Sequence, residues 1–96
     1  MIRPYRVAIA PSAADVIRSL HPDLKHSVRN ALTALQREPT LGAPLGKELE
    51  GLWRYRVRRY RVVYGIERSA REIQVVAVGP RSTVYEDLAE SKRQAR

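Results

Sequence analysis

Residues 52–67 read L-W-R-Y-R-V-R-R-Y-R-V-V-Y-G-I-E, and this stretch decides the fold. Basic residues alternate along it with aromatic and aliphatic ones, which is typical of strands with one buried and one exposed face. A two-residue turn at Arg58 and Arg59 predicts an antiparallel hairpin. The register then pairs Val57 with Tyr60, Arg56 with Arg61, Tyr55 with Val62, Arg54 with Val63 and Trp53 with Tyr64.

The hairpin has two unlike faces, because residues directly opposite each other share a face of the sheet. The face suited to a core carries Trp53, Tyr55, Val57, Tyr60, Val62 and Tyr64. The other face carries Arg54, Arg56, Arg61 and Val63. Arg56 and Arg61 repel each other from opposite positions, which destabilises a sheet. We therefore expect this face to bind an anionic partner.

Length and composition limit the chain to one small domain. It has 96 residues, and we expect a single domain over residues 1–90 with a polar tail over residues 91–96. There is no cysteine, so disulfides, thiolate nucleophiles and cysteine zinc sites are excluded. No apolar run approaches the ~18 residues of a membrane span. The first residues lack the apolar segment of a signal peptide, so we expect a cytoplasmic protein.

The charge of the chain also favours an anionic partner. Eighteen Lys and Arg oppose ten Asp and Glu, which gives a formal net charge of +8. Lysine occurs only at Lys25, Lys47 and Lys92, so most basic residues are arginines. Arginine holds phosphate or carboxylate through two parallel hydrogen bonds. Nucleic acid or an acidic protein is therefore a better explanation of the charge than solubility alone.

Periodicity and chain breakers predict the elements before the hairpin. We expect a first strand over residues 5–10, and then a helix that Ser12 begins in a capping box. A second helix, capped by Asp23, ends before Pro39. The very short link makes the two helices an antiparallel pair. Residues 40–51 are rich in Gly and Pro and are expected to be mostly loop.

The elements after the hairpin complete an α+β domain. A strand over residues 73–78 is apolar on both faces, which is typical of a covered central strand. Ser82 is expected to cap a last short helix, and the polar residues 91–96 are expected to fray. The order is β-α-α-β-β-β-α. It predicts a largely antiparallel four-stranded sheet with a helical hairpin packed on one face.

Two motifs carry a resemblance to a known family. Residues 49–64 read L-E-G-L-W-R-Y-R-V-x-x-Y-R-V-V-Y, and residues 78–85 read V-G-x-R-x-x-x-Y. With the order of elements, they resemble the RelE/ParE toxin superfamily of bacterial toxin-antitoxin systems over nearly the whole chain. The resemblance implies a RelE-like fold and a small toxin neutralised by an antitoxin encoded beside it. RelE-type toxins enter the ribosomal A site and cleave messenger RNA, whereas ParE-type toxins inhibit DNA gyrase and are not nucleases.

The resemblance also implies which residues are catalytic. The positions of RelE-type enzymes fall on Arg54, Arg56, Arg61, Arg81 and Tyr85, and we expect Arg58, Arg59 and Lys47 to contact RNA. The chain departs from the family pattern in three respects. RelE itself has Lys where Arg54 and Arg56 stand, and an arginine can hold a phosphate but is a poor general base. The hairpin tip is Arg58-Arg59 where relatives often have Gly-Asp, and Pro80 stands where relatives often have His or Lys.

The leading interpretation is a metal-independent endonuclease that cuts ribosome-bound message by attack of the RNA 2′-hydroxyl on the scissile phosphate. Arg61 and Arg81 would hold that phosphate, while Arg54 and Arg56 hold flanking phosphates and the developing charge. Tyr85 would stack on a base or transfer a proton. No cofactor is expected, and the sequence offers no cluster of metal ligands.

Other interpretations stay open. The chain could be a ParE-type toxin that binds gyrase without catalysis, or a non-enzymatic partner module. Arg54 and Arg56 could form a solvated face that meets acidic antitoxin residues, and Arg81 could cap the sheet. Tyr85 could serve packing or lie in the interface with the antitoxin. The expected partners are an acidic antitoxin that folds on binding and messenger RNA in the ribosomal A site. We expect no membrane partner, and DNA contact only through the toxin-antitoxin complex.

Overall fold

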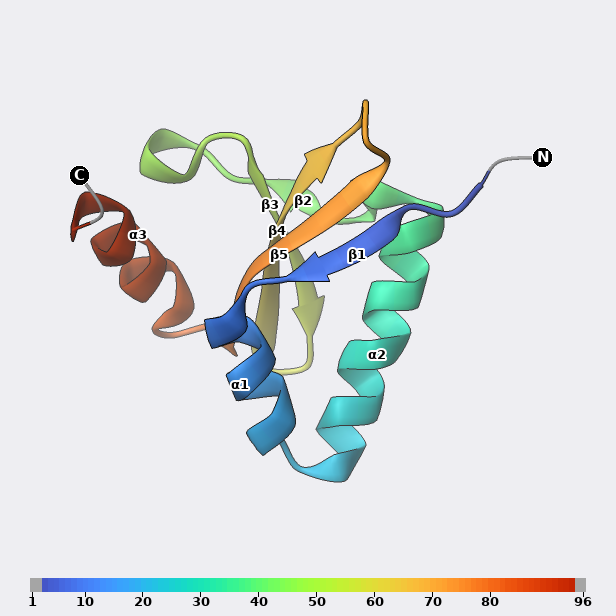
Figure 1. Ribbon diagram of the computed structural model, residues 1–96. Coiled ribbons are helices and arrows are strands. Elements are labelled where there is room, and N and C mark those ends of the chain that lie inside the picture. The colour runs from blue at the N-terminus through green and yellow to red at the C-terminus, as the bar shows by residue number, and fades with distance from the viewer. Residues whose placement is uncertain (1–2, 95–96) are drawn as a thin grey trace.

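One five-stranded sheet forms the centre of the fold in the computed structural model, which describes residues 3–94 (Figure 1). The strands are β1 (Arg6–Ile9), β2 (Ala43–Pro44), β3 (Leu52–Val57), β4 (Tyr60–Glu67) and β5 (Glu72–Pro80). The helices are α1 (Pro11–Ser19), α2 (Pro22–Arg37) and α3 (Val84–Gln94), with short 3₁₀ helices η1 (Pro39–Leu41) and η2 (Lys47–Leu49). The predicted α+β class and the order of the main elements are confirmed.

The sheet has one strand more than the sequence predicts. Its order is β1-β5-β4-β3-β2, with β1 parallel to β5 and the other pairs antiparallel. The additional strand is β2, which lies in the stretch predicted as loop and pairs with Trp53 and Arg54. Two residues are too few to produce an alternating pattern, so periodicity could not reveal this strand.

The hairpin of β3 and β4 has the predicted register at every pair, from Val57 with Tyr60 to Trp53 with Tyr64. Its turn consists of Arg58 and Arg59. Arg58 adopts a left-handed backbone conformation, with φ of 56°. Tight hairpin turns require this conformation, and glycine adopts it with the least strain. The hairpin therefore keeps the predicted register without a glycine at its tip, and Arg58 bears the backbone strain of the positive φ.

All three predicted helix caps are wrong. Helix α3 begins at Val84, so Thr83 directly precedes it, and the Ser82 hydroxyl makes no hydrogen bond to a described residue. Helix α1 begins at Pro11 with Ala10 as N-cap, so Ser12 makes no capping bond. Helix α2 begins at Pro22, and its N-cap is His21, whose Nδ1 accepts the backbone N–H of Asp23 at 3.3 Å. Proline suits the first helical position because its φ is already helical and it has no N–H to leave unpaired. Among residues 3–94, no helix is long and apolar enough to span a membrane.

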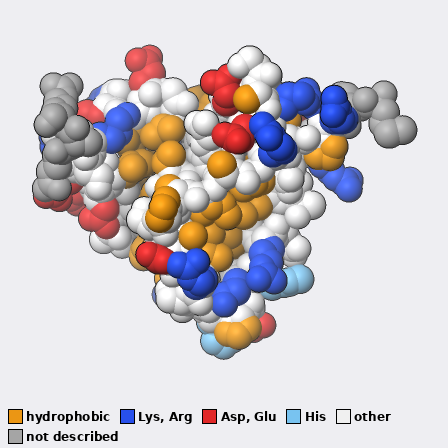
Figure 2. Space-filling model, in the orientation of Figure 1, with side chains coloured by type: hydrophobic (Ala, Val, Ile, Leu, Met, Phe, Trp, Pro, Cys, Tyr) orange, Lys and Arg blue, Asp and Glu red, His pale blue; other side chains and the backbone are white. Residues whose placement is uncertain are grey.

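Helices α1 and α2 pack on one side of the sheet and enclose the core (Figure 1). The core cluster consists of Ala13, Leu20, Val28, Ala31, Leu35, Val57, Val62, Tyr64, Ile73, Val75 and Val78. Trp53, Tyr55 and Tyr60 are partly buried and pack against this cluster, so the predicted core face of the hairpin is confirmed. Figure 2 shows this helical side, where hydrophobic side chains gather in the centre between α1 and α2.

Helix α3 lies on the opposite side, with the arginines. Its Val84 is buried beside Gly79, which stands opposite Arg61 in the sheet. Leu49 and Val63 are buried outside the main cluster as well, so this side has a small apolar centre of its own. Residues 91–94, predicted as a polar tail, form the last turn of α3, and residues 95–96 lie outside the described residues.

The Tyr64 side chain fastens the loop before β3 to the core. The ring is fully buried, and its hydroxyl donates to the carbonyl oxygen of Pro39 at 2.6 Å and accepts the backbone N–H of Gly42 at 3.2 Å. Burial raises the pKa of the Tyr64 phenol above its ordinary value. The protonated form is therefore part of the folded structure, since a phenolate cannot donate to Pro39.

Tyr64→Phe is expected to lower the free energy of unfolding by about 1–3 kcal/mol, because two loop groups lose their partner. Since the raised pKa belongs to the folded state, this stabilisation is complete below about pH 10 and falls as the pH rises above it. Urea denaturation of both proteins from pH 8 to pH 11 measures the two effects. If the variant loses stability above pH 10 as steeply as the wild type, Tyr64 does not cause the alkaline loss.

Candidate active site

One pocket of about 360 Å³ brings five predicted residues together, and its walls are Arg54, Arg56, Arg61, Arg81 and Tyr85. These residues come from β3, from β4, from the segment after β5 and from the first turn of α3. The hairpin register places Arg56 beside Arg61, and the pairing of Arg61 with Gly79 brings the end of β5 alongside. We call this space the arginine pocket.

Arg61 is the buried member of the pocket. Its exposed fraction is 7%, whereas Arg54, Arg56 and Arg81 are exposed. Its Nη1 donates to the carbonyl oxygen of Tyr60 at 2.9 Å and to that of Arg58 at 3.2 Å. Nε and Nη2 make no hydrogen bond to any residue between 3 and 94, so they remain free for a ligand. The guanidinium is thus held in place by the hairpin turn.

The same turn also positions Arg81. The carbonyl oxygen of Arg59 accepts the backbone N–H of Arg81 at 2.8 Å. The carbonyl oxygens of the two tip residues therefore bind the two arginines that the sequence assigns to the scissile phosphate, Arg58 to the Arg61 side chain and Arg59 to the Arg81 backbone. Hydrogen bonds of this kind orient charged groups before a ligand arrives.

Arg58→Gly is expected to raise the free energy of unfolding by about 0.5–1 kcal/mol, because glycine tolerates the positive φ. Arg59→Gly is the matched control: it removes the same charge, but Arg59 is not among the residues with positive φ. Guanidinium denaturation of both variants measures the difference. An Arg58→Gly protein no more stable than Arg59→Gly would contradict the strain at the tip.

A larger pocket of about 790 Å³ adjoins the arginine pocket at the tip, and its walls are Arg56, Arg58, Arg59, Arg61, Pro80, Arg81 and Ser82. The structure therefore joins the predicted RNA contacts Arg58 and Arg59 to the site. Lys47 lies in η2 and lines none of the pockets around the hairpin. We call this larger space the tip pocket.

Ser82 is a site residue that the sequence did not reveal. The sequence assigned it only as a helix cap, whereas it lies on the wall of the tip pocket. Its position depends on the hydrogen bond between Arg59 and Arg81, which joins segments more than twenty residues apart. A residue pattern along the chain carries no signal for such a contact.

The electrostatics of the site are uniformly positive. Within the part of the chain that the structure describes, no carboxylate forms an ion pair with Arg54, Arg56, Arg61 or Arg81. That same part contains no group of three or more His, Cys, Asp and Glu residues that could hold a metal ion. Converging guanidiniums without carboxylates suit phosphate groups, which accept charge-assisted and bidentate hydrogen bonds.

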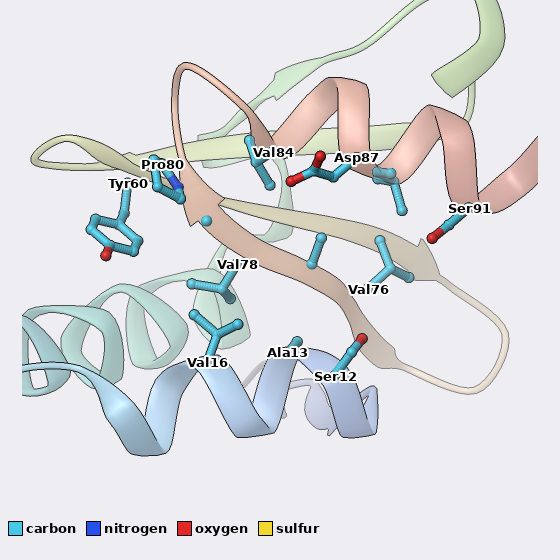
Figure 3. Close-up of a pocket in the computed structure, with 13 residues that line it drawn as sticks. Ser12, Ala13, Val16, Tyr60, Val76, Val78, Pro80, Val84, Asp87 and Ser91 are labelled. Atoms are coloured by element: carbon cyan, nitrogen blue, oxygen red, sulfur yellow. The ribbon is translucent and has the colours of Figure 1, made fainter.

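An apolar groove lies elsewhere, between α1 and α3 over the second half of β5 (Figure 3). Val16 and Ala13 stand on one wall, Val84 and Asp87 on the other, and Val78 between them. Its volume is about 470 Å³, larger than that of the arginine pocket. We place the candidate site at the arginines nevertheless, because the groove's one charged side chain is the acidic Asp87 and no Lys or Arg lines it.

Known proteins resemble this chain in sequence and in fold. The sequence model of the family described as "ParE toxin of type II toxin-antitoxin system, parDE" matches residues 3–85. "Toxin RelE" of Mycobacterium tuberculosis is 34% identical over 84 residues, which are 85% of this chain and 87% of that protein.

Two solved structures share the fold. The toxin-antitoxin complex RelBE2 of Mycobacterium tuberculosis contains a chain with a TM-score of 0.76 and 28% identity, over 85% of this chain and 97% of the other. The intact E. coli RelBE toxin-antitoxin complex contains one with a TM-score of 0.70 and 19% identity, over 79% and 95% of the two chains. The second likeness, at this low identity, bears on the fold alone.

Proposed function

The chain belongs to the RelE/ParE family and is the toxin of a type II toxin-antitoxin system, and we propose that it is an endoribonuclease that cuts messenger RNA on the ribosome. The observation that carries the proposal is the arginine pocket, which gathers four guanidiniums and a tyrosine at the end of one sheet. The guanidiniums repel one another, and a phosphodiester whose oxygens gain charge during cleavage benefits most from positive charges that are held in place before it binds.

The proposed reaction is an internal transesterification of RNA. The 2′-oxygen attacks the adjacent phosphorus, a new P–O2′ bond forms, and the P–O5′ bond breaks. The 2′-hydroxyl loses its proton and the leaving 5′-oxygen gains one, so the products are a 2′,3′-cyclic phosphate and a 5′-hydroxyl. The charge that develops on the phosphoryl oxygens is what fixed guanidiniums stabilise.

The roles follow from position and burial. Arg61, buried and held by the turn, and Arg81, bound to Arg59 through its backbone, take the scissile phosphate. Arg54 and Arg56 are exposed and take flanking phosphates. Tyr85 is half-buried at the pocket and is the candidate for base stacking or proton transfer. The charge is supplied by the chain itself, so the proposed mechanism needs no metal.

The proposed inhibitor is the antitoxin. The RelBE2 chain of Mycobacterium tuberculosis, 28% identical to this one, is part of a toxin-antitoxin complex, which supports a cognate antitoxin for this chain. We propose that an acidic segment of it covers the arginine pocket, since carboxylates pair with guanidiniums in the geometry that phosphates would otherwise use. Binding the antitoxin and binding RNA would then exclude each other.

A second candidate function is inhibition of DNA gyrase, which the match to the ParE toxin model favours. Induced expression in bacteria, followed by analysis of RNA and DNA, separates the two. The nuclease proposal expects cleaved messages with unaltered plasmid supercoiling. Intact messages with lost supercoiling would replace it by the gyrase proposal.

A further inference from the structure

Strand β3 has an open edge beside the arginine pocket. β2 pairs only with Trp53 and Arg54, and the N–H of Leu45 bonds to the carbonyl oxygen of Leu52 at 2.8 Å. Alternate residues of a strand direct their backbone groups to the same edge. The N–H and C=O of Arg56 therefore point to the same edge of β3 that β2 covers at Trp53 and Arg54. At Arg56 no described strand pairs with this edge.

A pocket of about 340 Å³ lies between this open edge and α2, and we call it the edge notch. Its walls are Ser27, Asn30 and Ala31 from α2, with Tyr55, Arg56, Val57 and Arg58. The notch is shallow and open to solvent, so a base would lie against its walls rather than inside an enclosed cavity. Of the five residues that line the arginine pocket, only Arg56 also lines the notch, so the roles proposed above do not explain the notch.

Two arginines connect the edge notch to the candidate site. Arg56 lines the notch, the arginine pocket and the tip pocket, and Arg58 lines the notch and the tip pocket. Both side chains are exposed and have no carboxylate partner among residues 3–94. A polyanion bound in the arginine pocket can thus extend into the notch and stay in contact with arginine side chains along the whole path.

The other walls of the notch suit a nucleobase. Asn30 is exposed, and its side-chain amide makes no hydrogen bond to a described residue, so it offers donors and an acceptor together. The amide of asparagine pairs with base edges through two hydrogen bonds. Tyr55 adds aromatic surface, and Ser27 bonds through its hydroxyl to the Asp23 carbonyl oxygen at 3.2 Å, with its lone pairs left to accept.

We propose that the edge notch binds the base of a nucleotide flanking the scissile phosphate and that Asn30 selects it. Single-stranded RNA then runs from the arginine pocket across Arg56 and Arg58 to α2. The inference rests on the proposed function, because it takes RNA as the ligand of the arginine pocket. It adds a source of base preference, which guanidiniums on phosphates do not provide.

Binding of four 2′-O-methyl homopolymers tests the inference, because these RNA analogues lack the attacking hydroxyl and stay intact. Fluorescence anisotropy gives the dissociation constants of the A, C, G and U forms. We expect wild-type protein to prefer one base, and Asn30→Ala to reduce the ratio of best to worst affinity by about fivefold or more. Thr33→Ala, also exposed on α2 but outside the notch, should keep the wild-type ratio.

The outcomes separate this inference from the proposed function. Equal affinity for all four polymers, no binding, or an unchanged ratio in Asn30→Ala would overturn the edge notch as a base site, whether or not the protein cuts message. A loss of poly-glutamate binding in Asn30→Ala without a change in the RNA ratio would make the notch a protein site and overturn it too. Base preference that depends on Asn30, in a protein that leaves message intact, would support the notch and refute the nuclease.

Discussion

Arg61→Ala is expected to lower the rate of cleavage of ribosome-bound message by about 100- to 1,000-fold. The Arg61 guanidinium is buried, and the carbonyl oxygens of Arg58 and Tyr60 hold Nη1, while Nε and Nη2 bond to no described residue. A charge fixed in a site of low dielectric stabilises a developing phosphoryl charge more than a mobile surface charge does. Single-turnover cleavage on stalled ribosomes, at saturating toxin, measures the effect.

The controls separate the loss of charge from a loss of structure. Arg29→Ala removes an exposed arginine of α2 that lines none of the pockets at the hairpin and should leave the rate unchanged. Arg61→Lys keeps the charge without the planar fork and should fall between alanine and wild type. A folded Arg61→Ala protein, verified by thermal denaturation, that cuts at the wild-type rate would remove Arg61 from its proposed role.

The second large effect concerns stability. Gly42→Ala is expected to lower the free energy of unfolding by about 1–3 kcal/mol, because the position has no room for a methyl group. An added Cβ would lie 2.6 Å from the Tyr64 hydroxyl and closer still to the carbonyl oxygen of Arg54. The loop would have to move away from the sheet, which loosens the Gly42 bond to Tyr64 and the pairing of β2 with Arg54.

Gly46→Ala is the matched control for this prediction. Gly46 lies four residues further along the same loop, has φ of −127° and has open space where a Cβ would stand. Its replacement should change stability by no more than about 0.5 kcal/mol, with a small gain from the stiffer unfolded chain. Urea denaturation of both variants at pH 7 decides the matter. Equal losses would mean that close packing at Gly42 is not the cause.

The hairpin could be predicted from the sequence because its information is local. Alternation over residues 52–67 and a two-residue turn fix which residues face each other, and the structure has that register at every pair. The same alternation places Tyr64 and Arg61 on opposite faces of β4, so it assigns one face to the core and the other to the candidate site. It also brought Arg54, Arg56 and Arg61 together before any longer-range contact was known.

What covers each face could not be predicted, because that depends on segments far apart in the chain. Val63 was placed among the arginines, yet it is fully buried. Arg61 was expected on an open face, yet it is buried and bound by the turn. The backbone hydrogen bond that Arg81 donates to Arg59 and the position of α3 could not be predicted from local sequence patterns either. The helix starts were missed for a local reason, since Pro11 and Pro22 begin helices that we expected Ser12 and Asp23 to cap.

The chemistry of the RNA ends produced by the purified toxin on translating ribosomes tests the central proposal most directly. The account predicts a 5′-hydroxyl on the downstream fragment, which polynucleotide kinase labels without prior phosphatase treatment, and a 2′,3′-cyclic phosphate on the upstream fragment. Both ends should form about 100- to 1,000-fold more slowly with Arg61→Ala. Intact message at saturating toxin, or cleavage that leaves a 5′-phosphate, would contradict the account.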